Sequence, residues 1–278
     1  MQDAATGQAA RLIAGGAATV AGAVLADSSI EHYRGSFENR TMVLPLVTAT
    51  LSILTNGAVV AGGRPAVPKL LASWRLTAPI HVAAIGVGAV GFGFHSYNIL
   101  KQPGGVTWQA IFYKAPIGAP AAMVLAGVLG SAAMTLQAGG RSLGPVPLLS
   151  GRALAGTAAL GIAGSAAEAA LLHFRGAYHN PAMYLAVTIP PLTALSLAGA
   201  AITGRGHPIT VAALGLTAAL GLIGSAFHAY GVSRNMGGWK NWRQNLVVGP
   251  PIPAPPAFTG LAIAGLGALL LMGRGRRD

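Results

Sequence analysis

Eight apolar segments of about 20 residues each restrict the folds open to this sequence more than any other feature. They cover approximately residues 10–30, 42–62, 77–97, 115–137, 152–172, 182–203, 208–230 and 254–273. An apolar segment of about this length spans the hydrocarbon core of a bilayer as an α-helix. Transmembrane β-strands would instead alternate apolar and polar residues, and these segments do not. The sequence therefore predicts an all-α integral membrane protein with eight transmembrane helices, in contact with the lipid bilayer.

The composition agrees with this fold class. Only 9% of the 278 residues are charged, whereas a soluble domain carries roughly 25%. The chain has 40 glycines, and small residues allow transmembrane helices to approach one another closely. It has no cysteine, which excludes disulfides and thiolate metal sites. The net charge of +12 is attributed to loops that follow the positive-inside rule, and no nucleic-acid partner is expected.

Two polar motifs occur twice in the chain. Residues 31–42 recur at 172–183, at a constant offset of 141 residues (173 − 32 = 141), with His, Arg, Gly, Asn, Met and two aromatic residues in the same order. A second motif, Phe94-His95-Ser96-Tyr97, recurs as Phe227-His228-Ala229-Tyr230, and each copy is followed by paired glycines, a tryptophan and prolines. The shared residues are mostly polar in a mostly apolar chain, which indicates a site rather than core packing.

The two copies predict two tandem four-helix repeats, residues 1–140 and 141–278. Each repeat has an even number of spans, so the copies have the same orientation, and an axis along the membrane normal would relate them. The first and third helix of each repeat both end at a motif histidine. All four histidines, His32, His95, His173 and His228, are therefore expected at one depth near one membrane face.

These four histidines are the candidate cofactor and metal ligands. Neutral imidazole is a common ligand of iron and other metals, and histidine is an axial ligand of haem. Pairs of helices in one bundle could hold haem b from both faces, either within each repeat or by pairing His32 with His173. A quinone is the second candidate ligand, and a purely structural role for the histidine loops is the third interpretation. His81 and His207 have no counterpart in the other repeat and are left outside the site.

Neighbouring residues extend the candidate site. Arg34 and Arg175 are suited to haem propionates or a quinone head group, because guanidinium binds carboxylates in a bidentate manner. Small residues before two of the histidines are expected to leave room for a flat macrocycle; they are Gly91, Gly93, Gly224 and Ser225.

Two carboxylates occupy matched positions, each five residues before a motif histidine. Asp27 and Glu168 would lie inside or near the membrane, where carboxylates are costly and indicate function. We expect either a role in a proton path or an ion pair with Arg34 or Arg175. Asn39 and Asn180 are expected to cap the helices that follow the motif.

Loop charges give a weak prediction of orientation. Ten Lys and Arg residues lie on the side of the termini (Arg11, Arg64, Lys69, Arg75, Arg141, Arg152, Arg205, Arg274, Arg276 and Arg277) and eight on the motif side. The positive-inside rule then places both termini in the cytoplasm and the motif loops in the periplasm of a bacterial inner membrane.

The sequence is most consistent with an electron-transfer subunit that holds haem b or a quinone and serves an extrinsic redox protein. Two alternatives remain open. One is a cofactor-free scaffold whose repeated loops bind other subunits of a membrane complex, and the other is a small-solute transporter. No arrangement typical of an enzyme is visible, so a non-catalytic subunit is favoured over a self-sufficient enzyme.

Overall fold

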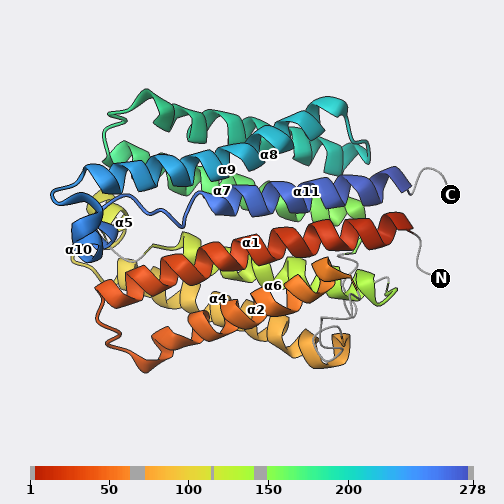
Figure 1. Cartoon of the computed structure of the whole chain (residues 1–278), viewed down its shortest axis with the longest axis horizontal. Helices are drawn as coiled ribbons and strands as arrows, with labels where there is room; N and C mark the ends of the chain where they lie inside the picture. The colour runs from red at the N-terminus through yellow and green to blue at the C-terminus, as the bar shows by residue number, and fades with distance from the viewer. Residues whose placement is uncertain (1–3, 63–72, 114–115, 141–148, 275–278) are drawn as a thin grey trace.

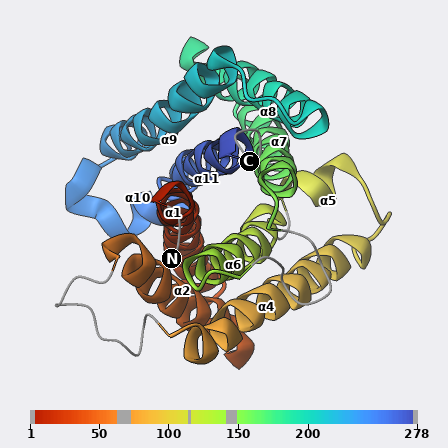
Figure 2. The ribbon, with the colours of Figure 1, turned by 90° about the vertical axis from the view of Figure 1, so that its right-hand side faces the viewer.

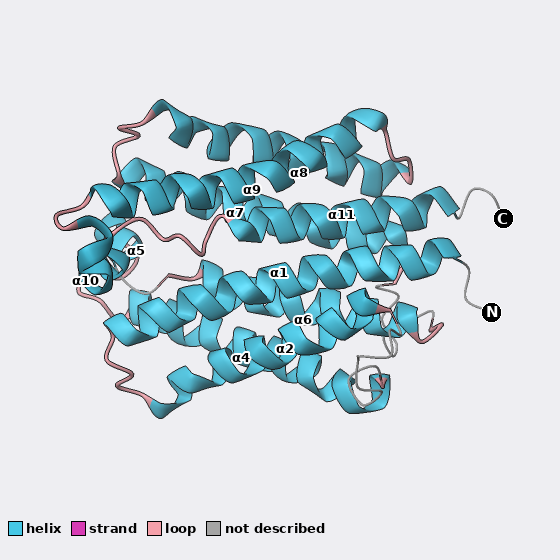
Figure 3. Cartoon of the chain, in the orientation of Figure 1, coloured by secondary structure: helices cyan, strands magenta, loops and turns pink. Residues whose placement is uncertain are grey.

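The computed structural model describes residues 4–62, 73–113, 116–140 and 149–274, and every regular element within these ranges is helical (Figure 3). The long helices are α1 (Ala4–Arg34), α2 (Leu44–Ala61), α4 (Trp74–Leu100), α6 (Gly118–Gln137), α7 (Gly151–Arg175), α8 (Leu185–Thr203), α9 (Pro208–Arg234) and α11 (Pro256–Arg274). The short ones are η1 (Arg40–Val43), α5 (Trp108–Tyr113), η2 (Pro181–Tyr184), η3 (Gly238–Asn241) and α10 (Trp242–Val248).

Eight helices in the described ranges are long and apolar enough to cross a membrane, which confirms the expected number. The helices that carry the motif histidines are longer than predicted, because nothing in the sequence stops them before the first loop glycine or asparagine. Helix α1 continues to Arg34, before Gly35, and α9 continues to Arg234, before Asn235. The histidines consequently lie inside the last two turns of their helices.

The eight long helices run side by side, with both termini at one end of the bundle and α5 and α10 at the other (Figure 1). Viewed along the bundle, α1, α6, α7 and α11 lie toward the centre, between α2 and α4 on one side and α8 and α9 on the other (Figure 2). The main core contains Ile13, Leu129, Ile162 and Leu261, one from each central helix. The peripheral helices leave large apolar side chains exposed, for example Val82 and Leu192, as lipid-facing helices do.

The most extensive packing between central helices is the contact of α1 with α11, where two glycines face each other. A Cβ added at Gly16 would lie 2.4 Å from the carbonyl oxygen of Gly260, and one added at Gly260 would lie 2.6 Å from the carbonyl oxygen of Gly16. Only glycine allows the two backbones to approach this closely. This is the small-residue packing on which helix association in lipid depends.

The two short helices on the motif side each contact a helix distant in sequence. Helix α5 packs against α7, and α10 packs against α1. The segments between α4 and α6 and between α9 and α11 therefore run along the end of the bundle before the chain re-enters it. Six of the charged loop residues used above to predict orientation lie outside the described ranges: Arg64, Lys69, Lys114, Arg141, Arg276 and Arg277.

We expect Gly16→Ala to destabilise the protein by about 1–3 kcal/mol, because the added methyl group forces α1 away from α11. Gly22→Ala is the matched control on the same helix, since nothing lies within 4 Å of a Cβ at that position. Thermal unfolding in detergent, followed by circular dichroism, would measure both. Equal melting temperatures for the two variants would contradict the packing argument.

Candidate functional site

The loops that follow α1 and α7 have the same backbone conformation. Ser36 and Phe37 have φ values of 56° and 49°, and Ala177 and Tyr178 have values of 56° and 46°. Two consecutive non-glycine residues in the left-handed region are unusual and costly. Hydrogen bonds to the preceding helix stabilise the loops: the N–H of Phe37 donates to the carbonyl of His32 at 3.0 Å, and that of Tyr178 to the carbonyl of His173 at 3.1 Å.

The asparagine of each loop begins the next helical element. The Asn39 side chain accepts a hydrogen bond from the N–H of Thr41 at 2.9 Å, and the Asn180 side chain accepts one from the N–H of Ala182 at 3.0 Å. These residues are the N-caps of η1 and η2. The predicted capping role is confirmed, although each asparagine caps a 3₁₀ turn that leads into the long helix.

Each of the four motif histidines contacts a backbone carbonyl through Nδ1. His32 Nδ1 lies 2.6 Å from the Met42 oxygen, His173 Nδ1 lies 3.0 Å from the Met183 oxygen, and His228 Nδ1 lies 2.7 Å from the Pro251 oxygen; His95 makes the same contact with Pro116. A carbonyl can only accept, so Nδ1 of each neutral ring carries the hydrogen. Nε2 then keeps its lone pair, which is the state of a histidine that binds a metal.

The structure brings the histidines together within each half of the chain. The ring centroids of His173 and His228 lie 6.4 Å apart at an interplanar angle of 78°. His32 and His95 are near enough to interact electrostatically. No ring contact joins His32 to His173, both of which the structure describes. The cross-repeat alternative is therefore the less favoured pairing.

The small residues beside the histidines do not leave the room that the sequence predicted. A Cβ added at Gly224 would lie 2.9 Å from Pro255, and one added at Gly91 would lie 3.5 Å from Pro120. Ser225 donates a hydrogen bond to the Ile252 carbonyl at 2.9 Å. The space is filled at Gly224 by Pro255 and at Ser225 by the chain just before α11, whereas Gly91 makes only an ordinary van der Waals contact. Gly93 alone faces open space.

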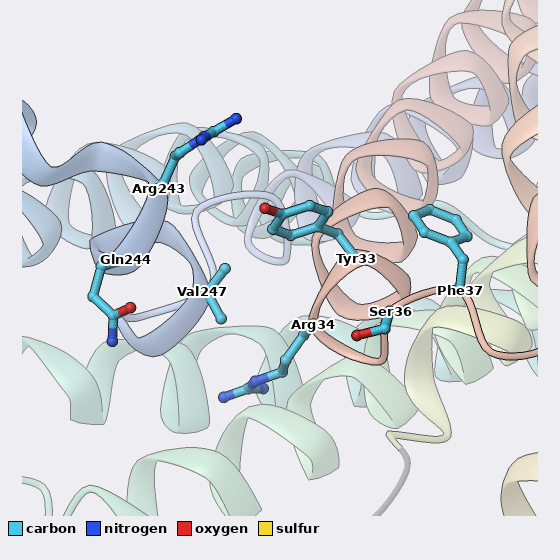
Figure 4. A pocket seen from close by; sticks show the side chains of 7 residues that line it. All are labelled: Tyr33, Arg34, Ser36, Phe37, Arg243, Gln244 and Val247. Atoms are coloured by element: carbon cyan, nitrogen blue, oxygen red, sulfur yellow. The ribbon is translucent and has the colours of Figure 1, made fainter.

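A pocket of about 560 Å³ lies between the end of α1 and α10 (Figure 4). Arg34 lines it but also forms an ion pair with Glu31, one turn earlier, at 3.0 Å. The remaining lining residues come from the motif loop and from α10: Tyr33, Ser36, Phe37, Arg243, Gln244 and Val247. Sequence reasoning missed Arg243, whose only signal was its position beside the repeated tryptophan. Arg175, the predicted counterpart of Arg34, is exposed at the end of α7.

The two matched carboxylates have different surroundings. The Oε1 atom of Glu168 accepts a hydrogen bond from the N–H of Gly118, at the start of α6, at 3.1 Å. Asp27 makes no hydrogen bond or ion pair within the described part of the chain, although it is close enough to Glu168 to interact electrostatically. Among the described residues, Arg34 forms its ion pair with Glu31 and not with either of these carboxylates.

A chemical difference between the halves explains this asymmetry. The prolines Pro116 and Pro120 correspond to Pro251 and Pro255 at an offset of 135 residues (251 − 116 = 135). The position that corresponds to Gly118 is therefore Pro253, which has no N–H to donate. Asp27 thus lacks the donor that Glu168 uses.

Among the described residues, no three His, Asp, Glu or Cys side chains gather as a metal-binding group. The chain matches no protein-family model, and neither a curated protein nor a solved structure is significantly similar to it.

We expect Glu168→Leu to destabilise the protein by about 1–3 kcal/mol, because the Gly118 N–H loses its partner. Glu168→Gln retains an oxygen acceptor and loses only the attraction between a carboxylate and a helix N-terminus, about 0.3–1 kcal/mol. Thermal unfolding of both variants in the same detergent would test this order. A glutamine variant as unstable as the leucine variant would show that the hydrogen bond to Gly118 is not the important contact.

Proposed function

We propose that this chain is the membrane subunit of an electron-transfer complex and that it binds haem b near the membrane face that carries the motif loops. The observation that carries the proposal is the common state of the four histidines. Each donates Nδ1–H to a backbone carbonyl and keeps Nε2 as a free electron-pair donor. Haem b, when bound, supplies one-electron chemistry between ferrous and ferric iron.

The spacing of His173 and His228 supports axial ligation. Two imidazoles on opposite sides of one metal, each at a metal–nitrogen distance of about 2.0 Å, have ring centroids about 6 Å apart. The observed separation is 6.4 Å. His173 and His228 would hold one haem, which would supply one-electron chemistry there. His32 and His95 would form the second ligand pair.

The pocket between α1 and α10 supports a binding role for the motif side. Its two arginines, Arg34 and Arg243, make it suitable for a carboxylate or for the head group of a quinone. Asp27 and Glu168 lie on the helices that carry His32 and His173. In this proposal they move protons to or from a quinone.

The proposal includes the predicted organisation of the chain. Residues 1–140 and 141–278 would be two parallel four-helix repeats related by an axis along the membrane normal. The termini would lie in the cytoplasm of a bacterium and the motif loops in the periplasm, where an extrinsic redox protein would exchange electrons with the haem. The identical hydrogen bonds of the two loops support the repeat.

A cofactor-free scaffold is the alternative, and the loops supply the observation in its favour. Several repeated residues have a structural contact in both copies. His32 packs edge-on against Phe37 and His173 against Tyr178, each with ring centroids 6.1 Å apart. The methyl groups of Met42 and Met183 lie over the loop glycines Gly35 and Gly176. Exposed aromatic residues such as Tyr33 and Phe174 would then bind other subunits.

We expect the protein purified from its native membrane to show a b-type α-band in a dithionite-reduced minus oxidised absorption spectrum. Removing an axial ligand should remove the band of that haem, so His228→Ala should lose about half of the signal and His95→Ala the other half. His179→Ala is the matched control, because His179 is exposed in the motif loop after α7 and its hydrogen bond within the described chain is to the Gly176 carbonyl.

The outcomes separate the two candidate functions. A band that His228→Ala and His95→Ala weaken and His179→Ala does not would support haem ligation by the motif histidines. A flat spectrum from correctly folded protein, isolated together with its native partners, would overturn the haem proposal and favour the scaffold.

The proposed orientation of the chain in the membrane leads to a separate prediction. A fluorescent protein fused after Asp278 should fluoresce, and alkaline phosphatase fused there should be inactive, because the C-terminus is expected in the cytoplasm. The same two reporters inserted at His179 should give the opposite results. An active phosphatase at the C-terminus would invert the proposed topology.

A further inference from the structure

A buried polar pair, His81 and Asn56, lies in the bundle far from the motif histidines. His81 is the eighth residue of α4, about 10 Å from the start of that helix, and Asn56 is on α2. Both side chains are 0% exposed. Each has one polar atom without a hydrogen-bond partner, Nδ1 of His81 and Oδ1 of Asn56. Buried polar atoms are rarely left unpaired, so this pair requires an explanation.

The neighbours of His81 determine which ring nitrogen carries the hydrogen. The Thr55 hydroxyl donates its only hydrogen to a carbonyl of its own helix, that of Leu51 at 2.9 Å or that of Ser52 at 3.1 Å. The Thr55 oxygen therefore accepts from Nε2–H of His81, which lies 3.4 Å away. In the neutral ring Nδ1 is then an acceptor.

The amide of Asn56 is fixed by a similar argument. Its Nδ2 lies 2.8 Å from the Ser52 carbonyl oxygen and 3.2 Å from the Ser52 hydroxyl. Exchanging the amide nitrogen and oxygen would place two acceptor oxygens 2.8 Å apart, so the observed orientation is the favourable one. Oδ1 of Asn56 is consequently the second unpaired acceptor.

The side chains of His81 and Asn56 both pack against one glycine of α6. A Cβ added at Gly130 would lie 2.5 Å from Nδ1 of His81 and 3.0 Å from Nδ2 of Asn56. Helix α6 thus presses both side chains into the same small space. Each of the two side chains packed there has an acceptor without a partner, Nδ1 of His81 and Oδ1 of Asn56, and a proton added to His81 would turn its acceptor into a donor.

The other half of the chain contains the same packing site in apolar form. At the sequence offsets of the two motifs, Asn56 corresponds to Leu197 (56 + 141 = 197) and His81 to Leu214 (81 + 133 = 214). A Cβ added at Gly265 would lie 3.1 Å from Leu197 and 3.0 Å from Leu214. Two leucines can therefore fill such a site. Packing alone does not explain why a histidine and an asparagine occupy it in the first half of the chain.

Among the described residues, no charged group lies beside His81 and Asn56 that would explain why two polar side chains are buried there. Helices α2 and α6, which enclose it, contain no Asp, Glu, Lys, Arg or His. On α1 the charged residue on the same side of the bundle is Arg11, whose guanidinium lies at Gly62, beyond the end of α2. On α4 the other titratable residues are Arg75, near its start, and His95 and Tyr97, near its end. Within the described part of the chain, no charged group acts electrostatically on His81.

We propose that His81 and Asn56 form a proton-binding site, in which a proton on Nδ1 of His81 is donated to Oδ1 of Asn56. The resulting imidazolium donates both of its N–H groups, one to Thr55 and one to Asn56. This site is independent of haem binding.

The test is a pH titration of the full chain in nanodiscs, with ¹⁵N-labelled histidine observed by NMR. The titration runs from about pH 8 to about pH 4, a range that includes the ordinary imidazole pKa of about 6.5. The double variant Asn56→Leu/His81→Leu identifies the His81 resonances. It should fold, because it reproduces the leucine pair of the other half. We expect Nδ1 of His81 to change from unprotonated to protonated in this range.

Asn56→Leu alone removes the acceptor of the bound proton, and it should lower the proton affinity of His81 about tenfold or more, since hydrogen bonds to charged groups are the strong ones. His207 is the internal control, because it is exposed at the same end of the bundle and should titrate identically in both proteins. An Nδ1 that stays unprotonated throughout, or an affinity that Asn56→Leu leaves unchanged, would overturn the proposal.

Discussion

The close approach of α1 and α11 is the contact on which the arrangement of the bundle depends. In lipid, the hydrophobic effect does not drive helices to associate. Close packing of their backbones must therefore supply the free energy of association. Gly16 and Gly260 provide it where the first and the last long helix of the described chain meet. The contact places α1 and α11 at the centre of the bundle (Figure 2).

The motif side shows how backbone groups can prepare side chains for chemistry. The carbonyls that bind Nδ1 of the four histidines come from segments just before or at the start of the returning helices, so each histidine also holds a loop against its helix. A structural and a chemical role are therefore compatible in one residue. Nδ1 makes the structural contact, and Nε2 remains for a ligand.

Hydropathy and the internal repetition were sufficient to predict the number of spans and the capping by Asn39 and Asn180, because these features depend on local spacing, whereas the pairing of the histidines remained open. The hydrogen bond from Gly118 to Glu168 depends on how α6 packs against α7. The residue pattern of a single helix does not predict such packing between helices. The space predicted at Gly224 is absent for the same reason, because Pro255 packs there from another part of the chain. His81 was set aside because its partner, Asn56, lies on a different helix.

The contact between α1 and α11 also has a consequence for biosynthesis. A membrane protein enters the bilayer from its N-terminus as the ribosome releases it, so α1 is inserted long before Pro256–Arg274 has been made. Until then the Gly16 face of α1 has only lipid or another protein beside it. The central packing can form only after the last helix has entered the membrane, and a chain that ends before α11 would leave the bundle open along its middle.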